Sequence, residues 1–171
     1  MARFLIGEYQ AMRDEEFELL YAEHAPGLLA FLAYRTGDRP LAEDLLADTF
    51  ERALRARRRF DPRRAGRKTW LYSIALNLLR DHARRRQAEG RALDRVAEPA
   101  AGVAPEERLS ERDELGRALG GLSDEEREAV ALRYGADLTV PEIAKLTGEK
   151  LTTVEGRVYR ALRKLRQELS D

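Results

Sequence analysis

The sequence of 171 residues contains no cysteine, and this absence excludes disulfide bonds, cysteine-based zinc sites and thiol catalysis. It has only 12 glycines and 6 prolines, a low share that disfavours an all-β protein. No apolar stretch approaches the roughly 20 residues needed to span a bilayer. The amino terminus also lacks the apolar run of a signal peptide. These absences predict a soluble, cytoplasmic protein that does not insert into a membrane.

Residues for catalysis or metal binding are equally scarce. Only two histidines occur, His24 and His82, and neither belongs to a cluster with metal-ligand spacing. The sequence has no glycine-rich phosphate loop and no nucleophile motif, and the carboxylates of "EDLLAD" fall on a helix surface. We therefore predict no enzyme activity, no cofactor, no metal and no small-molecule substrate.

Charge is abundant but unevenly distributed. The 31 basic and 31 acidic residues cancel in total. Acidic residues nevertheless dominate residues 8–51, and arginines dominate residues 52–91. A basic block of this kind is the electrostatic footprint of a phosphate-binding surface. The alternative is a solvated helix face that pairs with the acidic block.

Apolar residues at three- and four-residue steps predict helices throughout residues 15–86. The first ends near His24, and Pro26 opens a second. Asp38 follows a Thr-Gly stop and caps the third helix. A basic loop then separates the third helix from a fourth that starts at Trp70. We expect an all-α bundle of about four helices.

A linker divides the chain. Residues 87–108 are rich in Ala, Gly and Pro and lack a sustained apolar period, so we expect them to be mobile or extended. A second helical module follows over residues 109–171, and a short tail over residues 1–14 precedes the first. The sequence therefore predicts two small all-α domains joined by a flexible linker.

The second module ends in a helix-turn-helix pattern. The stretches 123–126 and 139–142 fit capping boxes, and Gly148 supplies the sharp turn between the last two helices. A recognition helix enters the major groove of DNA with its amino end first. The last helix would present to DNA a polar and basic face: Lys150, Thr152, Thr153, Glu155, Arg157, Arg160 and Lys164.

Four stretches, taken in order, resemble the extracytoplasmic-function (ECF) sigma factors, the smallest class of bacterial RNA polymerase initiation factor. They are "LAEDLLADTF", "FDPRRAGRKTWLYSIALNLLRDHARRR", "LSDEEREAVALRYGADLTVPEIAKLTG" and "TTVEGRVYRALRKLR". The resemblance covers residues 17–169, and the linker lies in the corresponding place. It implies a nucleoid-associated factor that binds core RNA polymerase, directs it to promoter DNA and has no catalysis of its own.

The resemblance also implies roles for individual residues. It places the polymerase contact on the acidic stretch, recognition and melting of the −10 promoter element on the loop and helix that follow, and −35 recognition on the helix-turn-helix. It makes an anti-sigma factor a further expected partner. The polymerase-binding candidates are Glu43, Asp44, Leu45, Asp48 and Phe50. The −10 candidates are Arg63, Arg64, Arg67, Lys68, Asn77, Arg80, Arg84 and Arg85.

Glu155 departs from the family, whose members usually carry lysine or arginine at this position. A carboxylate can accept a hydrogen bond from a cytosine amino group. Glu155 therefore either selects sequence or pairs internally with Arg157 or Lys150, and a weakened −35 contact is the remaining alternative. Two other protein classes stay open from the residues alone. One is a helix-turn-helix regulator that binds duplex DNA without polymerase, and the other is a helical adaptor without DNA contact.

Overall fold

The computed structural model describes residues 12–93 and 118–169, and these residues fold as helices with no strand. The predicted all-α class is therefore confirmed. None of the described helices is both long and apolar enough to cross a membrane. The helical elements are α1 (Asp14–Thr36), α2 (Arg39–Ala56), η1 (Arg57–Arg59), α3 (Arg67–Leu93), α5 (Asp124–Val130), η2 (Ala131–Gly135), α6 (Val140–Thr147) and α7 (Leu151–Glu168).

Helix α1 is one continuous helix, whereas the sequence predicted two helices separated at Pro26. Proline lacks the N–H that would bond to the carbonyl one turn back. Pro26 is exposed, so water can solvate the freed carbonyl of Ala22. The buried residues Leu20, Leu28 and Phe31 lie on both sides of Pro26, and their packing holds the helix together. The first module thus has three long helices and the short turn η1, not four helices.

The junction between α1 and α2 forms as the sequence predicts. Gly37 ends α1 with φ of 65°, a left-handed conformation that costs glycine little. Asp38 then caps α2, because its carboxylate accepts a hydrogen bond of 3.1 Å from the Leu41 N–H. This tight turn lays α2 against α1, where Phe50 contacts Phe17 and Tyr21.

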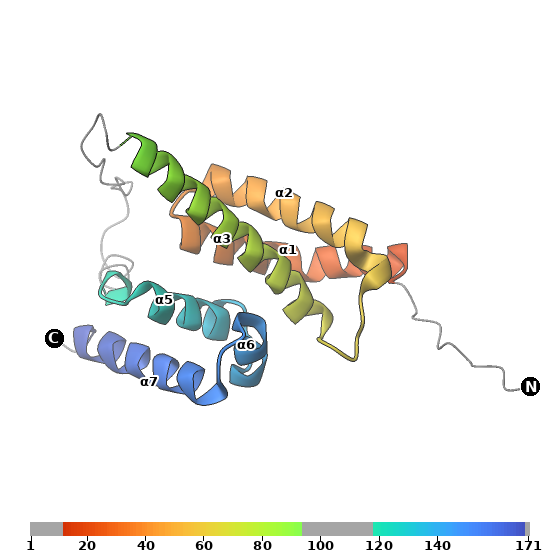
Figure 1. The fold of residues 1–171 in the computed structure, drawn as a ribbon. Coiled ribbons are helices and arrows are strands. Elements are labelled where there is room, and N and C mark those ends of the chain that lie inside the picture. Colours follow the sequence, from red (N-terminus) through yellow and green to blue (C-terminus); the bar gives the residue numbers. More distant parts are fainter. Residues whose placement is uncertain (1–11, 94–117, 170–171) are drawn as a thin grey trace, which may run out of the picture.

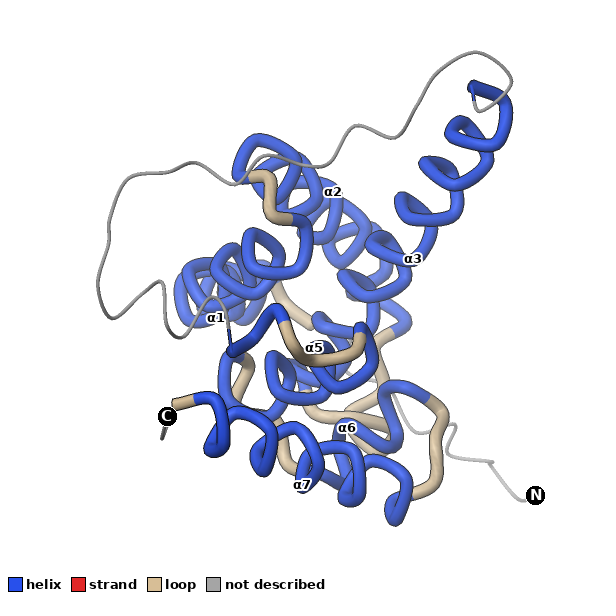
Figure 2. The backbone as a smooth tube through the Cα atoms, turned by 90° about the vertical axis from the view of Figure 1, so that its left-hand side faces the viewer, coloured by secondary structure: helices blue, strands red, loops and turns tan. Residues whose placement is uncertain are grey.

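Helix α3 extends further than the sequence predicted. The linker was expected to begin at residue 87, but α3 continues to Leu93, so residues 87–93 belong to the helix. Most of these residues are good helix formers, and one interior glycine costs only about 1 kcal/mol. In Figures 1 and 2 this end of α3 extends away from α5, α6 and α7. The rest of the expected linker, residues 94–108, lies outside the described residues, as do residues 109–117 of the second module.

The second module is built on local signals that the sequence shows. Ser123 and Glu126 form a reciprocal capping box at the start of α5, and Thr139 and Glu142 form another at the start of α6. Gly148 ends α6 in the left-handed conformation with φ of 74°. Between α5 and α6 the chain passes through η2, a single π-helical turn. Helices α6 and α7 then form the predicted helix-turn-helix.

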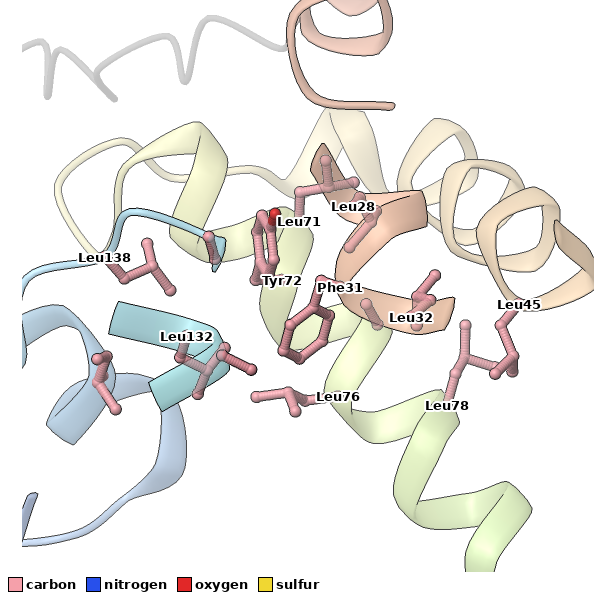
Figure 3. Packing of buried hydrophobic residues seen from close by; sticks show 14 of the residues in the cluster. Leu28, Phe31, Leu32, Leu45, Leu71, Tyr72, Leu76, Leu78, Leu132 and Leu138 are labelled. Atoms are coloured by element: carbon pink, nitrogen blue, oxygen red, sulfur yellow. The ribbon is translucent and has the colours of Figure 1, made fainter. Parts of the chain in front are cut away.

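The two modules pack directly against each other. In Figure 1 the three helices of the first module lie over α5–α7, and the turned view of Figure 2 shows the same stacking. One buried apolar cluster includes residues from both modules. Figure 3 shows Phe31, Tyr72 and Leu76 of the first module facing Leu132 and Leu138 of the second. Burial raises the pKa of Tyr72 to about 12. Met12, at the end of the predicted tail, is also buried in the cluster.

Candidate functional site

The outer face of α2 carries the acidic residues predicted to bind polymerase. Asp44 and Asp48 are exposed and one helical turn apart, so their carboxylates lie on the same face. Neither carboxylate makes a hydrogen bond or ion pair with any residue that the structure describes. Glu43 is also exposed, but its carboxylate pairs with Arg39 at 3.0 Å. The two aspartates are therefore available to a cationic partner.

Leu45 and Phe50 of α2 are buried in the core. Only 5% and 6% of their surfaces are exposed. Phe50 packs against Tyr21 with ring centroids 4.6 Å apart, and Thr49 donates a hydrogen bond of 2.6 Å to the Leu45 carbonyl oxygen. This burial argues against a direct polymerase contact by Leu45 or Phe50. Their packing instead fixes which face of α2 points outward.

The basic loop leads into the start of α3, and two of its four candidate side chains, Arg67 and Lys68, have acidic partners. Arg63 and Arg64 are exposed in the turn after Phe60, where the Arg63 N–H bonds to the Asp61 carboxylate at 2.9 Å. The remaining loop candidates are engaged by other parts of the chain. Arg67 pairs with Glu16, and Lys68 donates a hydrogen bond of 3.2 Å to the Asp137 carbonyl oxygen.

The polar face of α3 holds the other four −10 candidates, and all four are exposed. Asn77 and Arg85 make no ion pair within the described residues. Arg84 pairs with Asp81, one turn back on the same helix, at 2.5 Å. Arg80 reaches the second module, where its guanidinium lies 3.4 Å from the Glu128 carboxylate.

Trp70 and Tyr72 belong to the structural side of α3, not to its polar face. Trp70 is half-buried against Phe60, with ring centroids 5.0 Å apart. Tyr72 is fully buried and contacts Phe31 edge-on at 5.4 Å. Both aromatic rings therefore position the polar face of α3, as residues at core spacing usually do.

The amino end of α7 presents the predicted recognition residues to solvent. Lys150, Thr152, Thr153 and Glu155 are all exposed. Glu155 makes no ion pair with any described residue. Internal pairing of Glu155 with Arg157, one of the alternatives left open by the sequence, is absent, because Arg157 forms two hydrogen bonds of 2.6 and 2.7 Å to the Glu149 carboxylate instead.

Two of the cations further along α7 are held internally. Lys164 donates a hydrogen bond of 2.7 Å to Glu126, and this contact lowers the pKa of the Glu126 carboxyl. The bidentate contact with Arg157 lowers the pKa of Glu149 in the same way. Arg160 is exposed, and its guanidinium lies over Gly156, where an added Cβ would approach a guanidinium nitrogen to 3.3 Å.

Tyr159 is a further surface residue of α7 that the sequence reasoning did not select. Its side chain is 70% exposed, which is unusual for a large aromatic residue. It follows Thr152 by seven residues and Glu155 by four, so the three share one helix face. The helical spacing in the sequence already places Tyr159 on this face, but an aromatic residue in a helix is more often part of a core.

No group of three or more His, Cys, Asp or Glu side chains suited to a metal ion occurs within residues 12–93 and 118–169. The contacts that join the two modules were also missed by the sequence reasoning. Arg35 and Glu128 form an ion pair between the modules, at 3.3 Å. Since these two residues are 93 positions apart, no local pattern indicates that they meet.

Comparisons with known proteins agree with the two-module architecture. Residues 20–89 match the family model described as Sigma-70 region 2, and residues 112–165 match that described as Sigma-70, region 4. The chain is 35% identical to the RNA polymerase sigma factor CarQ of Myxococcus xanthus over 100% of this chain and 96% of the relative. It is 31% identical to the ECF RNA polymerase sigma factor RpoE of Cereibacter sphaeroides, covering 94% of this chain and 92% of that protein.

Two solved structures are similar over most of the chain. The sigma factor RpoE in complex with the anti-sigma factor NepR from Bartonella quintana has a TM-score of 0.76 and 26% identity, covering 91% of this chain and 98% of that one. CnrH in complex with the cytosolic domain of CnrY has a TM-score of 0.66 and 31% identity, covering 92% and 90%.

Proposed function

The chain belongs to the ECF group of the sigma-70 family, and from this premise we propose which of its surfaces bind core RNA polymerase and which bind promoter DNA. The first module docks on core polymerase and reads the −10 element, and the second module reads the −35 element. The chain has no catalysis of its own and uses no cofactor. Because its target is promoter DNA, we place it in the cytoplasm at the nucleoid.

The polymerase contact is assigned to Asp44 and Asp48, with Glu43 at its edge. The observation that carries this assignment is that both aspartates are exposed on one face of α2 without a partner in the described residues. An acidic helix face repels DNA and suits a basic protein surface. Leu45 and Phe50 support the contact from beneath, since both are buried.

The −10 element is assigned to the basic loop and the polar face of α3. A melted strand needs cationic grooves for its phosphates, and arginines on one helix face provide them. Arg63, Asn77 and Arg85 are exposed and free of ion pairs with described residues. Arg64, Arg67, Lys68, Arg80 and Arg84 complete the assigned set, although several of them contact other parts of the chain in this arrangement.

The −35 element is assigned to α6 and α7. Lys150, Thr152, Thr153 and Glu155 lie at the amino end of α7, the end that enters the major groove. Glu155 has no partner among the described residues, which favours direct contact with a base over internal pairing. Arg157, Arg160 and Lys164 lie further along the helix, where cations meet the phosphate backbone.

An anti-sigma factor is a further partner that we propose. The similar sigma factor RpoE was solved in complex with the anti-sigma factor NepR, and its likeness covers 91% of this chain. A regulator that binds DNA without polymerase is not favoured, because the chain matches both sigma-70 regions and not the helix-turn-helix alone.

A pull-down with core RNA polymerase tests the docking surface. We expect the unchanged chain to bind, and Asp44→Arg with Asp48→Arg to lose binding by at least about tenfold, since like charges would then face each other. The matched control is Glu18→Arg with Glu23→Arg, which makes the same charge change on exposed positions of α1. Run-off transcription from fragmented genomic DNA then reports promoter recognition. Equal polymerase binding by both double variants would contradict the assignment.

A further inference from the structure

Glu155 is a carboxylate without a local partner. In an α-helix, a charged side chain pairs with side chains three and four positions away. None of the residues at these positions around Glu155 is basic: Leu151, Thr152, Val158 and Tyr159. Glu155 is also exposed and forms no ion pair with any residue that the structure describes. Helix α7 therefore does not use this carboxylate for an internal contact.

The dipole of α7 does not account for Glu155 either. A negative charge stabilises a helix within its first turn, where the backbone N–H groups are free. Helix α7 begins at Leu151, and Glu155 is its fifth residue, so the carboxylate lies beyond that turn. The first turn itself contains no acidic residue. A charge placed for helix stability would stand at Thr152 or Thr153 instead.

The cation nearest to Glu155 in the sequence is held elsewhere. Arg157 donates two hydrogen bonds of 2.6 and 2.7 Å to the Glu149 carboxylate. Lys150 and Arg160 stand five residues before and five residues after Glu155, and both are exposed without an ion pair to a described residue. These two cations are available to phosphates on either side of the carboxylate, and their attraction offsets the repulsion between Glu155 and DNA.

Glu155 shares an open helix face with Thr152 and Tyr159. All three side chains are exposed, and 70% of the surface of Tyr159 is accessible. Tyrosine is enriched at binding interfaces, where its ring provides contact area. Figures 1 and 2 both show α7 on the side of the second module that lies away from α1, α2 and α3. A partner can therefore reach this face in the arrangement that the structure shows.

A carboxylate in the major groove of DNA has one favourable base edge to contact. Guanine presents two acceptors there, and thymine presents an acceptor and a methyl group. Adenine has an amino group, but the acceptor N7 stands beside it and repels the second carboxylate oxygen. Cytosine presents its N4 amino donor without an acceptor of its own on that edge. Cytosine is therefore the base that Glu155 accommodates best.

We propose that Glu155 makes this chain select cytosine at one position of its −35 element. The inference rests on the proposed assignment of α7 to −35 recognition, and it adds the base and the residue that chooses it. The cytosine amino group donates a hydrogen bond to the Glu155 carboxylate. At any other base the carboxylate loses water without gaining a donor, so affinity falls. Glu155 thus confers specificity largely by rejecting other sequences.

The test measures base preference with the full chain bound to core RNA polymerase. Run-off transcription from genomic fragments with the unchanged chain first identifies a promoter, and each position of its −35 element is then randomised. Sequencing of the bound templates gives the preferred base at each position. We expect cytosine on one strand to exceed every other base by about tenfold at one position.

Substitutions of Glu155 should change the preferred base at that same position. Glu155→Gln should prefer adenine, because an amide can both donate to N7 and accept from N6. Glu155→Lys should prefer guanine, because an ammonium group donates to N7 and O6. The matched control is Glu168→Lys, which makes the same charge change at the exposed last residue of α7 and should still select cytosine.

Either of two results would overturn the proposal. One is the same base preference in the unchanged chain, Glu155→Gln and Glu155→Lys. The other is an equal gain in affinity for all templates in Glu155→Lys, which would mean that the carboxylate only repels phosphates. Failure of the proposed sigma-factor assignments would appear separately, because the unchanged chain would then not bind polymerase or would select no −35 sequence at all.

Discussion

The acidic face of α2 and the arginine-bearing faces of α3 and α7 differ in how much of their charge is already paired. Asp44 and Asp48 make no ion pair with the described residues, whereas Arg80, Arg84, Arg157 and Lys164 are each held by a carboxylate. The surface assigned to polymerase is therefore open in this arrangement, and much of the surface assigned to DNA is occupied. The difference shows that Asp44 and Asp48 can meet a cationic partner without losing an internal contact, whereas the paired cations must exchange one.

The largest loss of stability is expected in the buried apolar cluster that both modules share. Leu132→Ala removes a fully buried side chain at the module boundary and should lower the free energy of unfolding by about 2–5 kcal/mol. Denaturation followed by circular dichroism measures this loss. Leu169→Ala, at a half-exposed position beyond α7, is the control and should change stability by less than about 0.5 kcal/mol.

The second prediction compares two arginines on the same helix. Arg157→Ala leaves the partly buried Glu149 carboxylate without its two donors and should cost about 1–3 kcal/mol. Arg160→Ala removes an exposed side chain and should cost less than about 0.5 kcal/mol. Both should weaken −35 binding by the polymerase complex. Equal losses of stability in the thermal melts of the two variants would mean that the pairing of Arg157 with Glu149 does not stabilise the fold.

The third prediction concerns pH. The hydrogen bond from Thr139 is the main cause that lowers the pKa of Glu142 below its ordinary 4.5, and Thr69 of the other module adds to it. A carboxyl with a lowered folded-state pKa stabilises the fold fully above its unfolded value, and this stability is lost as pH falls below 4.5 through the folded value. Between pH 5 and 3, Glu142→Gln should therefore show a smaller drop in melting temperature than the unchanged chain. An identical drop in the two proteins would mean that Glu142 does not contribute to the loss of stability at low pH.

The smallest effect on stability is expected on the outer, acidic face of α2. Asp44→Asn and Asp48→Asn remove exposed carboxylates without partners, so each should change the free energy of unfolding by less than about 0.5 kcal/mol. Their polymerase binding should still fall measurably. A loss of stability as large as that of Arg157→Ala would show that these aspartates have a structural role, and would remove the contrast between the two surfaces.

Elements defined by neighbouring residues were predictable from the sequence. The capping boxes at Ser123 and Thr139, the cap at Asp38 and the turn at Gly148 each depend on residues within four positions, and each forms as predicted. The exposed residues at the start of α7 follow from helical periodicity in the same way. These local signals were sufficient to find the helix-turn-helix and its outer face.

Features that depend on distant residues were not predictable. The continuity of α1 through Pro26 comes from packing on both sides of the proline, which outweighs the local signal. The burial of Leu45 and Phe50 depends on where α1 lies. The partners of Arg80 and Lys68 lie 48 and 69 positions away, so the pattern of arginines predicted a phosphate-binding surface but not these contacts.

The most direct test of the assigned polymerase contact is core RNA polymerase binding by the variant Asp44→Arg with Asp48→Arg, measured beside Glu18→Arg with Glu23→Arg. We expect the first variant to lose at least about tenfold in affinity and the second to bind like the unchanged chain, because only the first reverses the charge of the outer face of α2. Equal binding by the two variants would contradict the assignment of the polymerase contact to α2.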